Sequence, residues 1–491
     1  MKHSSWILLS ALTVGSCNRT PPDLQAVVDA ANALGGREKI LAIKTLTIEG
    51  AGSAPNLGQN TMPDSELPVW KVTEFRRTID LANSRMRVQQ LRTAQFLFAG
   101  ASTQRQDQGL DGDVAYNVGM DGTATRAGAD AARDRHIEML HNPIAIVRAA
   151  LGDPNTTVSG LRTAQNQKVV EIKTAKGERL TLAIDAMTNL PTRVTSMADN
   201  PNMGDVAIDT VFADYDDVGG VKLPRRYTTT IDKYPQFDLT VAKNTVDGAA
   251  PELEAPAAAK GAPVPAPPAI VVTAEPVGKG IWWLAGSGNH RSVVFEFENH
   301  LTLFEAPLNE ARSKAVIDKA RTLSTKPLTQ VVVSHHHFDH SGGLRVAVAE
   351  GLTVVTYKGN EDFFKDLVAR PHTIVPDALA KNPQPLKLVT VDDAMTMKDP
   401  AMEVQLYHLR DNPREGTNLF AYVPRDRILV QADLYDSTWL YHYWGENVIT
   451  NIEKIRKLRV DKQVPIHGAI QSYRDMVKTI KAAEKRAAGT N

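Results

Sequence analysis

The chemistry of this chain is concentrated in the stretch Leu328-Thr329-Gln330-Val331-Val332-Val333-Ser334-His335-His336-His337-Phe338-Asp339-His340-Ser341-Gly342-Gly343. Its first part has the β-branched content and the length of a buried strand. Four of the chain's 13 histidines then follow within six residues, a density that composition does not explain. Neutral imidazoles and ionised carboxylates at the rigid end of a strand can hold metal ions. The stretch therefore predicts a metal site at the end of this strand.

The spacing within this stretch divides the candidate ligands into two sets. His335 and His337 are two residues apart just past the strand, so their side chains can point toward one metal ion. Asp339 and His340 follow where the chain turns, and they can face a second position. His336 lies between two candidate ligands and is expected to point away from them.

Composition excludes several other classes of protein. A length of 491 residues predicts about two or three domains. Lys and Arg together number 56, as do Asp and Glu, and this balance argues against a nucleic-acid partner. The single cysteine excludes a cysteine-rich zinc site, so histidines and carboxylates must supply the ligands of any metal.

The N-terminus has the layout of an export signal. Lys2 is followed by a short apolar stretch over residues 6–14 and then by small residues. The only cysteine, Cys17, follows Val14-Gly15-Ser16, which resembles the lipobox of bacterial lipoproteins, where the cysteine is lipidated. We expect residues 1–17 to be a signal peptide with a lipobox, and the mature protein to be a periplasmic lipoprotein held at the outer membrane by its lipid anchor alone. The alternative is an ordinary signal peptide cut nearby, with Cys17 incidental.

Proline and alanine mark a boundary in the middle of the chain. From Pro251 to Pro268, six residues are Pro and six are Ala. Such a composition favours extended backbone and cannot bury a core. We predict a linker over residues 249–269, a β-rich domain over residues 23–248 and a second domain over residues 270–491.

The predicted β-rich domain contains one helical interruption. Apolar alternation, as in Leu180-Thr181-Leu182-Ala183-Ile184, is typical of its strands. Residues 130–151 have helical spacing instead, and Pro143 is expected to kink this helix or to split it in two. His136 and His141 lie on this segment without a partner motif, and they are expected to be solvated or to cap the helix.

An antiparallel sheet with one helical insert resembles the half-barrel of the carriers that sort outer-membrane lipoproteins. The likeness rests on this topology and on stretches such as Asp214-Tyr215-Asp216-Asp217-Val218-Gly219-Gly220-Val221-Lys222-Leu223-Pro224. It implies a concave face that holds a lipid or another hydrophobic ligand. The alternative is a sheet that buries its apolar face against its own helix.

The histidine-rich stretch carries the His-x-His-x-Asp-His motif of the metallo-β-lactamase superfamily, and the resemblance extends over about residues 270–475. Asp433 resembles the metal-bridging aspartate of that superfamily, and His467 resembles its last histidine ligand. The resemblance implies a second metal position formed by Asp339, His340, Asp433 and His467. It also implies an α+β protein whose C-terminal domain is a four-layered αβ/βα sandwich, preceded by the separate antiparallel β-rich domain.

One position departs from the pattern of the superfamily. In relatives similar to this chain, a third histidine of the first metal position follows an Asn-Pro pair, whereas here Arg414 follows Asn412-Pro413. A guanidinium group stays protonated and cannot coordinate a metal ion. Four outcomes stay open: an empty first position with one metal at the second; a weakly held metal on His335, His337 and Asp433, with Arg414 swung outward to bind an anionic substrate group; His408 as a substitute ligand; or a dead site.

The resemblance implies a zinc-dependent hydrolase that attacks the carbonyl group of a small-molecule β-lactam, lactone or ester with a metal-bound hydroxide. Asp339 would ligate the metal and orient that hydroxide, and Arg414 would bind the substrate. One or two zinc ions are expected, although iron or manganese would accept the same mixture of histidine and carboxylate ligands. The alternative is a non-catalytic periplasmic lipoprotein that binds a hydrophobic ligand and has a degenerate metal site.

Overall fold

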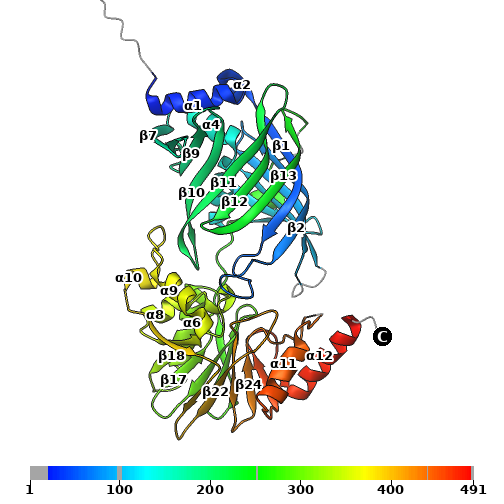
Figure 1. Ribbon diagram of the computed structural model, residues 1–491, viewed down its shortest axis with the longest axis vertical. Coiled ribbons are helices and arrows are strands. Elements are labelled where there is room, and N and C mark those ends of the chain that lie inside the picture. The colour runs from blue at the N-terminus through cyan, green and yellow to red at the C-terminus, as the bar shows by residue number, and fades with distance from the viewer. Residues whose placement is uncertain (1–19, 97–101, 250–252, 440, 488–491) are drawn as a thin grey trace, which may run out of the picture.

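The computed structural model describes residues 20–96, 102–249, 253–439 and 441–487. The N-terminal part is a large curved sheet with helices, and the C-terminal part has two further sheets with helices beside them (Figure 1). The predicted signal peptide and lipobox, residues 1–17 with Cys17, lie outside the described residues. Within the described part of the chain, no helix is both long enough and apolar enough to cross a membrane.

A single antiparallel sheet organises the N-terminal part of the chain, so the predicted β-rich domain is present. In spatial order its strands are β6 (Ala124–Arg126), β5 (Val114–Val118), β4 (Thr103–Asp111), β3 (Arg85–Ala94), β2 (Val69–Asp80), β1 (Thr45–Pro55), β13 (Tyr234–Val246), β12 (Lys222–Ile231), β11 (Gly204–Asp217), β10 (Pro191–Asn200), β9 (Arg179–Asp185), β8 (Gln167–Lys173) and β7 (Thr157–Ala164). Neighbours in the sheet are consecutive in sequence except at the centre, where the first strand pairs with the last.

Helices from two segments cover one face of this sheet. They are α1 (Pro22–Ala33), α2 (Arg37–Ala42), α3 (Ala129–Leu140) and α4 (Pro143–Gly152). Val27 of α1 and Ile146 of α4 share an apolar core with Leu182 of β9 and Val241 of β13. Because alternate side chains of a strand point to opposite faces, the apolar alternation of the strands places one row of side chains in this core.

The helical interruption is split at Pro143, as expected. Helix α3 ends at Leu140 and α4 begins at Pro143. The side chain of Asn142 caps α4, since its Oδ1 accepts hydrogen bonds from the backbone N–H groups of Ile144 at 3.0 Å and Ala145 at 3.2 Å. A proline at the first position of a helix lacks an N–H that would have no partner there, so it starts the second helix without cost.

His136 and His141 were expected to be solvated or to cap the helix; neither is solvated, and only His141 is at a helix cap. Both are buried, because the sheet covers the side of the helical segment that carries them. His136 Nδ1 lies 2.5 Å from a carboxylate oxygen of Glu178. His141 occupies the C-cap position of α3, and its two ring nitrogens lie 2.9 Å from the hydroxyl groups of Thr210 and Ser196.

Part of the Pro/Ala-rich stretch packs against the N-terminal sheet. Residues 250–252 lie outside the described residues, and α5 (Ala257–Gly261) follows them. Ala255 and Ala259 are buried beside Tyr116 of β5. The linker boundaries at residues 249 and 269 stay a prediction, while the segment between them is attached to the β-rich domain over part of its length.

Two sheets form the centre of the C-terminal part. The first contains β14 (Val272–Gly278), β15 (Ile281–Gly286), β16 (Ser292–Glu296), β17 (Leu301–Phe304), β18 (Leu328–Val332), β19 (Thr353–Tyr357) and β20 (Lys387–Val391). The second contains β21 (Ala394–Lys398), β22 (Glu403–His408), β23 (Leu419–Val423), β24 (Ile428–Gln431), β25 (Lys462–Pro465) and β26 (Gln471–Ser472). Strands β17 to β20 are parallel neighbours, as are β24 and β25, and the remaining pairs are antiparallel.

Helices lie on the outer faces of these two sheets. Beside the first sheet are α6 (Glu310–Arg321), α7 (Phe338–Ser341), α8 (Leu344–Ala349), η2 (Lys358–Asn360), α9 (Glu361–Ala369) and α10 (Ala378–Lys381), and beside the second are α11 (Gly445–Ile449), η3 (Thr450–Ile455) and α12 (Tyr473–Ala487). An apolar core lies between the sheets, with Phe295 and Val332 from one and Val404 and Val430 from the other. This is the predicted four-layered αβ/βα arrangement, and the α+β fold class is confirmed.

Within the described residues, the N-terminal and C-terminal parts contact each other near Asp205 and at the connection between β1 and β2. After α9, the carbonyl oxygen of Pro371 accepts a hydrogen bond of 2.8 Å from the backbone N–H of Asp205, and Arg370 pairs with Asp232. The second contact is made by the connection between β1 and β2, residues 56–68, which extends from the curved sheet toward the C-terminal part (Figure 1). We call this segment the β1–β2 loop.

The burial of His141 predicts a dependence of stability on pH. Burial, assisted by the charge of Arg77, lowers the pKa of this imidazole to about 4 from an ordinary value of 6.5. The unfolded chain therefore binds a proton more readily than the folded protein between these two values, and folding is penalised as the pH falls below 6.5. The expected loss between pH 7 and pH 5 is about 2 kcal/mol.

Urea denaturation of the wild type and of His141→Asn at both pH values measures this loss. The variant is expected to lose about 2 kcal/mol less than the wild type between pH 7 and pH 5. An equal pH dependence in the two proteins would show that His141 does not cause it.

Candidate metal centre

The candidate ligands meet where several strands end. The chain leaves β18 at Val332 and runs through the histidine-rich stretch into α7, while β24 and β25 are parallel neighbours whose carboxyl ends share one edge. Side chains that can bind metal gather there in two groups, which are His335, His337, Glu415 and Asp433, and Asp339, His340, Asp433 and His467. Within each group, the ligand atoms all lie within 4.8 Å of one another.

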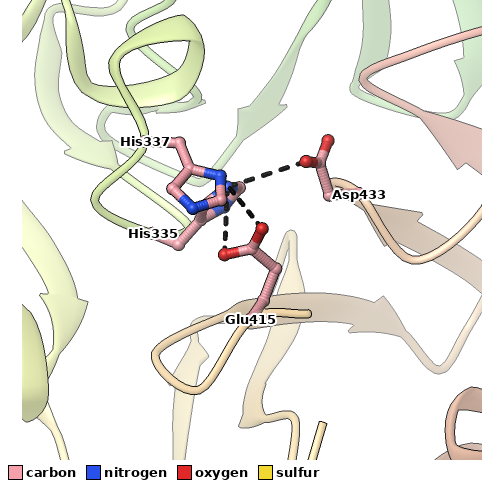
Figure 2. A group of neighbouring side chains, drawn as sticks. All are labelled: His335, His337, Glu415 and Asp433. Carbon is pink, nitrogen blue, oxygen red and sulfur yellow. Dashed lines mark ion pairs between the residues drawn. The ribbon is translucent and has the colours of Figure 1, made fainter. Parts of the chain in front are cut away.

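The first group combines two imidazoles with two carboxylates, and Figure 2 shows all four side chains pointing toward one another. Glu415 Oε1 lies 2.9 Å from His337 Nδ1, and Glu415 Oε2 lies 3.6 Å from His335 Nε2. Asp433 Oδ2 completes the group, 3.9 Å from His335 Nε2. The sequence has no third histidine at the expected place for this position, and the structure brings the carboxylate of Glu415 there.

The buried polar atoms of the first group lack hydrogen bonds. His335 Nε2 and both carboxylate oxygens of Glu415 are buried and have no hydrogen-bond partner, although their neighbours lie at ion-pair distance. A buried polar atom without a partner destabilises a folded protein by about 1–3 kcal/mol, and more if it is charged. A metal ion between these atoms would bond to all of them, so the residues present fit a metal ion.

The second group is the set that the resemblance implied, and the structure brings all four side chains together. The Nε2 atoms of His340 and His467 lie 3.1 Å apart, and each lies 3.1 Å from Asp433 Oδ1. Asp339 Oδ2 lies 3.4 Å from the first of these nitrogens and 3.5 Å from the second. Two ring nitrogens that both carried protons would repel each other at this distance, whereas two neutral ones can share a cation.

Burial and charge act differently on the ionisable groups of the two sets. Burial lowers the pKa of His335 and of His337 well below the ordinary histidine value, and it raises the pKa of Glu415 well above its usual range. Burial also opposes charge on His467, but the carboxylates of Asp339 and Asp433 raise its pKa to about 9. The first group therefore favours neutral imidazoles, which is the form that binds metal.

Each candidate histidine ligand has its second ring nitrogen close to a polar group. His335 Nδ1 lies 2.8 Å from the hydroxyl group of Ser334, and His340 Nδ1 lies 3.1 Å from Glu305 Oε2. His467 Nδ1 donates to the carbonyl oxygen of Asn289 at 2.7 Å. Partners of this kind set the orientation of the ring and leave the other nitrogen facing the metal.

The partner of the remaining histidine comes from the other end of the chain. His337 Nε2 donates a hydrogen bond of 2.8 Å to the carbonyl oxygen of Asn60, in the β1–β2 loop. The nitrogen of His337 that faces Glu415 is consequently Nδ1. One candidate ligand is thus oriented by the N-terminal domain.

A tight turn directs two successive side chains into the site. Asn412 Oδ1 accepts hydrogen bonds of 2.9 Å from the backbone N–H groups of both Arg414 and Glu415. The N–H of Gly416 donates to the carbonyl oxygen of Thr61 at 2.9 Å. The turn is therefore held from within by an asparagine side chain and from outside by the β1–β2 loop.

Arg414 lies inside the site, and its guanidinium group contacts both domains. Its Nη2 donates to Gln59 Oε1 at 2.6 Å and lies 3.5 Å from Asp433 Oδ2. Its Nη1 donates to the carbonyl oxygen of Gln59 at 3.2 Å. Gln59 Nε2 in turn donates to Asp339 Oδ1 at 3.1 Å, so the side-chain amide of Gln59 bridges Arg414 and Asp339.

Two further histidines, His336 and the possible substitute ligand His408, lie outside both groups. His336 Nδ1 lies 3.0 Å from the hydroxyl group of Thr417, so its ring points away from the candidate ligands as expected. His408 Nε2 donates to the carbonyl oxygen of Gly416 at 3.0 Å, and its ring stacks on Tyr357. Neither histidine belongs to a group of candidate ligands, although the ring of His336 lies edge-on to that of His337, with the ring centroids 4.7 Å apart.

Sequence patterns alone did not predict several residues of the site. Glu415 could have been noticed, because it is a carboxylate directly beside the position where a ligand was sought. Glu305 carries no such signal, although its two oxygens contact His340 and the backbone N–H of Ser334. Gln59 is 280 residues away from Asp339, and no local pattern links them.

A family model matches part of the C-terminal domain. Residues 285–376 match the model of the metallo-beta-lactamase superfamily. The matched segment includes the histidine-rich stretch and ends before Glu415, Asp433 and His467. The ligand groups and this match together support a metal-dependent hydrolase in general terms.

Solved metallo-β-lactamases resemble the C-terminal part of the chain. The one from Pontibacter korlensis is 15% identical, with a TM-score of 0.34 over 44% of this chain and 99% of that chain. The enzyme FIM-1 from Pseudomonas aeruginosa in its mono-zinc form is 15% identical, with a TM-score of 0.36 over 45% and 98%. The one from Hirschia baltica is 14% identical, with a TM-score of 0.33 over 43% and 97%. A comparison with curated proteins found no match.

The first group predicts that Glu415 is a metal ligand in this metallo-β-lactamase-like domain. In Glu415→Gln the carboxylate is replaced by a neutral amide of nearly the same shape, and we expect the content of divalent metal to fall from two ions per chain to one. Elemental analysis of the purified protein measures this content.

Glu361→Gln is the matched control, since Glu361 is a half-buried carboxylate outside both ligand groups that pairs with Lys365 on α9. It should leave the metal content unchanged. Two ions per chain in Glu415→Gln would contradict the assignment of Glu415 as a ligand.

Proposed function

We propose that this protein is an exported, zinc-dependent hydrolase that attacks the carbonyl carbon of a small-molecule ester, lactone or β-lactam and breaks its acyl C–O or C–N bond. The observation that carries the proposal is the pair of ligand groups that share Asp433. A shared carboxylate suits two ions about 3.5–4 Å apart, an arrangement found in many hydrolytic enzymes. When bound, such ions would lower the pKa of a coordinated water and polarise the carbonyl group of a substrate.

The residues around the two groups have separate parts in this reaction. Asp339 lies beside both His340 and His467. One of its carboxylate oxygens can accept a hydrogen bond from the attacking water and so orient it. Arg414 lies beside Asp433 and can donate hydrogen bonds to the oxyanion that develops on the carbonyl oxygen, or to an anionic group of the substrate. In this proposal, Asp339 is a catalytic residue and Arg414 binds substrate.

The composition of the two groups supports more than one metal. Each group has two imidazoles and two carboxylates, with Asp433 counted in both. Zinc accepts such mixed ligands in hydrolytic sites, and iron or manganese accepts them as well. We propose zinc as the resident ion, and elemental analysis identifies it.

The N-terminal sequence supports a location outside the cytoplasm. A basic residue, a short apolar stretch and Cys17 in a lipobox-like context favour export and lipid attachment. We propose that the protein is a periplasmic lipoprotein anchored to the outer membrane. Mass spectrometry of the mature N-terminus tests this, since a lipidated Cys17 as first residue is the expected result and an unmodified N-terminus elsewhere contradicts it.

Hydrolysis should depend on Asp339. We expect the metal-loaded wild type to hydrolyse at least one of a chromogenic cephalosporin, a lactone and an ester, and Asp339→Asn to lower kcat at least 100-fold, on the order of what removing a group that orients the nucleophile costs. Asp362→Asn is the matched control, because Asp362 is exposed on α9. Full metal loading without turnover of any of the three substrates would exclude the proposed activity.

The N-terminal domain contains a cavity that could bind a ligand, as the alternative of a non-catalytic binding protein requires. A cavity of about 350 Å³ lies between α3 and the sheet, lined by apolar side chains such as Phe75 and Ile208 and by Arg77 and Glu138, which pair with each other. Ligand pockets have volumes of about 300–1,000 Å³, so this cavity is at the small end of that range. We propose that it holds a hydrophobic ligand with a polar group.

Filling the cavity should abolish this binding. We expect Ile208→Trp to weaken the binding of a fluorescent fatty acid at least tenfold, because the indole occupies the space of the ligand. Val211→Trp serves as a control on the same strand, since Val211 is exposed and does not line the cavity. Equal affinities in the wild type and Ile208→Trp would place the fatty acid elsewhere.

A further inference from the structure

A cavity of about 300 Å³ lies between the two domains, directly beside the metal centre. It is enclosed on one side by the β1–β2 loop and on the other by the turn that follows Asn412 and by the segment before α11. Its apolar wall consists of Leu67, Pro68, Phe96, Pro413, Tyr443 and Trp444. We call it the interdomain pocket.

The β1–β2 loop that forms one wall is firmly held against the C-terminal domain. The carbonyl oxygens of Asn60 and Thr61 accept hydrogen bonds from His337 and from the backbone of Gly416. Gly58 has a φ of +73° and lies so close to the ring of Phe338 that an added Cβ would be 2.5 Å from it. Only glycine permits this approach, so the wall has a defined position in the folded protein.

The inner end of the interdomain pocket reaches the metal centre through polar side chains. Gln59 and Arg414 line the pocket, and they also contact Asp339 and Asp433 respectively. Trp444, on the apolar wall, donates a hydrogen bond of 3.2 Å from its indole N–H to the carbonyl oxygen of Asp433. A molecule in the pocket would therefore have one end against aromatic and proline side chains and the other beside the candidate ligands.

We propose that the interdomain pocket is the substrate-binding site and that the substrate is an acyl compound whose acyl group carries an uncharged ring. This proposal rests on the proposed hydrolase function. The ring would pack on the three aromatic side chains of the wall, and the reacting carbonyl group would lie at the inner end beside Arg414.

The dimensions and charges of the pocket favour this class of substrate. A volume of about 300 Å³ accommodates a single ring with a short acyl chain rather than a large molecule. Glu66 lines the same pocket and is exposed, so an anionic group on the ring would meet a carboxylate. The aromatic wall gives a flat ring favourable stacked or edge-on contacts.

The preference for a ring can be measured on the metal-loaded full chain. We expect the wild type to hydrolyse methyl phenylacetate with a kcat/KM at least tenfold above that for methyl acetate, as followed by proton release. Leu67→Trp fills the pocket, so it should raise the KM for methyl phenylacetate at least tenfold and bring the two kcat/KM values together. Tyr443→Ala is a second variant, for the case that Leu67→Trp disturbs folding. It removes part of the wall at a residue that is 40% exposed, and it should raise the same KM.

Leu161→Trp is the control, because Leu161 is exposed on β7, away from the pocket. It should keep the preference for the phenylacetate ester. The metal content and the melting temperature of all three variants should match those of the wild type, so that a change in KM reports on the pocket.

Binding without turnover separates this proposal from the proposed function. Phenylacetone has the ring and the carbonyl group but no bond to hydrolyse, and calorimetry should show that it binds the wild type at least tenfold more tightly than Leu67→Trp. If phenylacetone binds in this way and no ester is cleaved, the pocket stands and the hydrolase fails. If esters are cleaved without preference for a ring and the pocket variants change nothing, the hydrolase stands and the pocket proposal is overturned.

Discussion

The carboxylate of Asp433 is the group on which the metal centre depends. Its Oδ1 faces His340 and His467, its Oδ2 faces His335 and Arg414, and the two ligand groups meet only through it. Its backbone has a φ of +58°, a conformation that aspartate tolerates better than most residues and that costs free energy in others. The position just past β24, where the chain leaves the sheet, places this carboxylate between the two sets of imidazoles.

Local sequence patterns predicted the elements that bear the site, while contacts between distant segments were beyond them. The strand before His335 and the second ligand group followed from spacing and from a family motif, because such ligands lie at strand ends. The family pattern points to position 414 as the place of a ligand and gives no reason to consider its neighbour Glu415. The turn at Asn412, however, directs the side chains of both Arg414 and Glu415 into the site. The role of Gln59 could not be predicted, because its partners Asp339 and Arg414 are more than 250 residues away in sequence.

Arg414 is a buried cation beside two groups of candidate metal ligands. A guanidinium group cannot give up its proton, so it needs anionic or polar neighbours wherever it is buried. Here those neighbours are the carboxylates of Glu415 and Asp433 and two oxygen atoms of Gln59. The arginine therefore lies beside a candidate ligand rather than in its place, since the adjacent Glu415 faces His335 and His337.

The hydrogen bond from His337 to the carbonyl oxygen of Asn60 links two equilibria. A histidine that is oriented by the N-terminal domain binds a metal ion more tightly when that domain is in place, and a bound ion must then hold the domain in place by the same free energy. Metal binding and the association of the two domains therefore strengthen each other by the same free energy. A chain in a metal-poor compartment would accordingly have a more weakly attached N-terminal domain than the same chain in a metal-rich one.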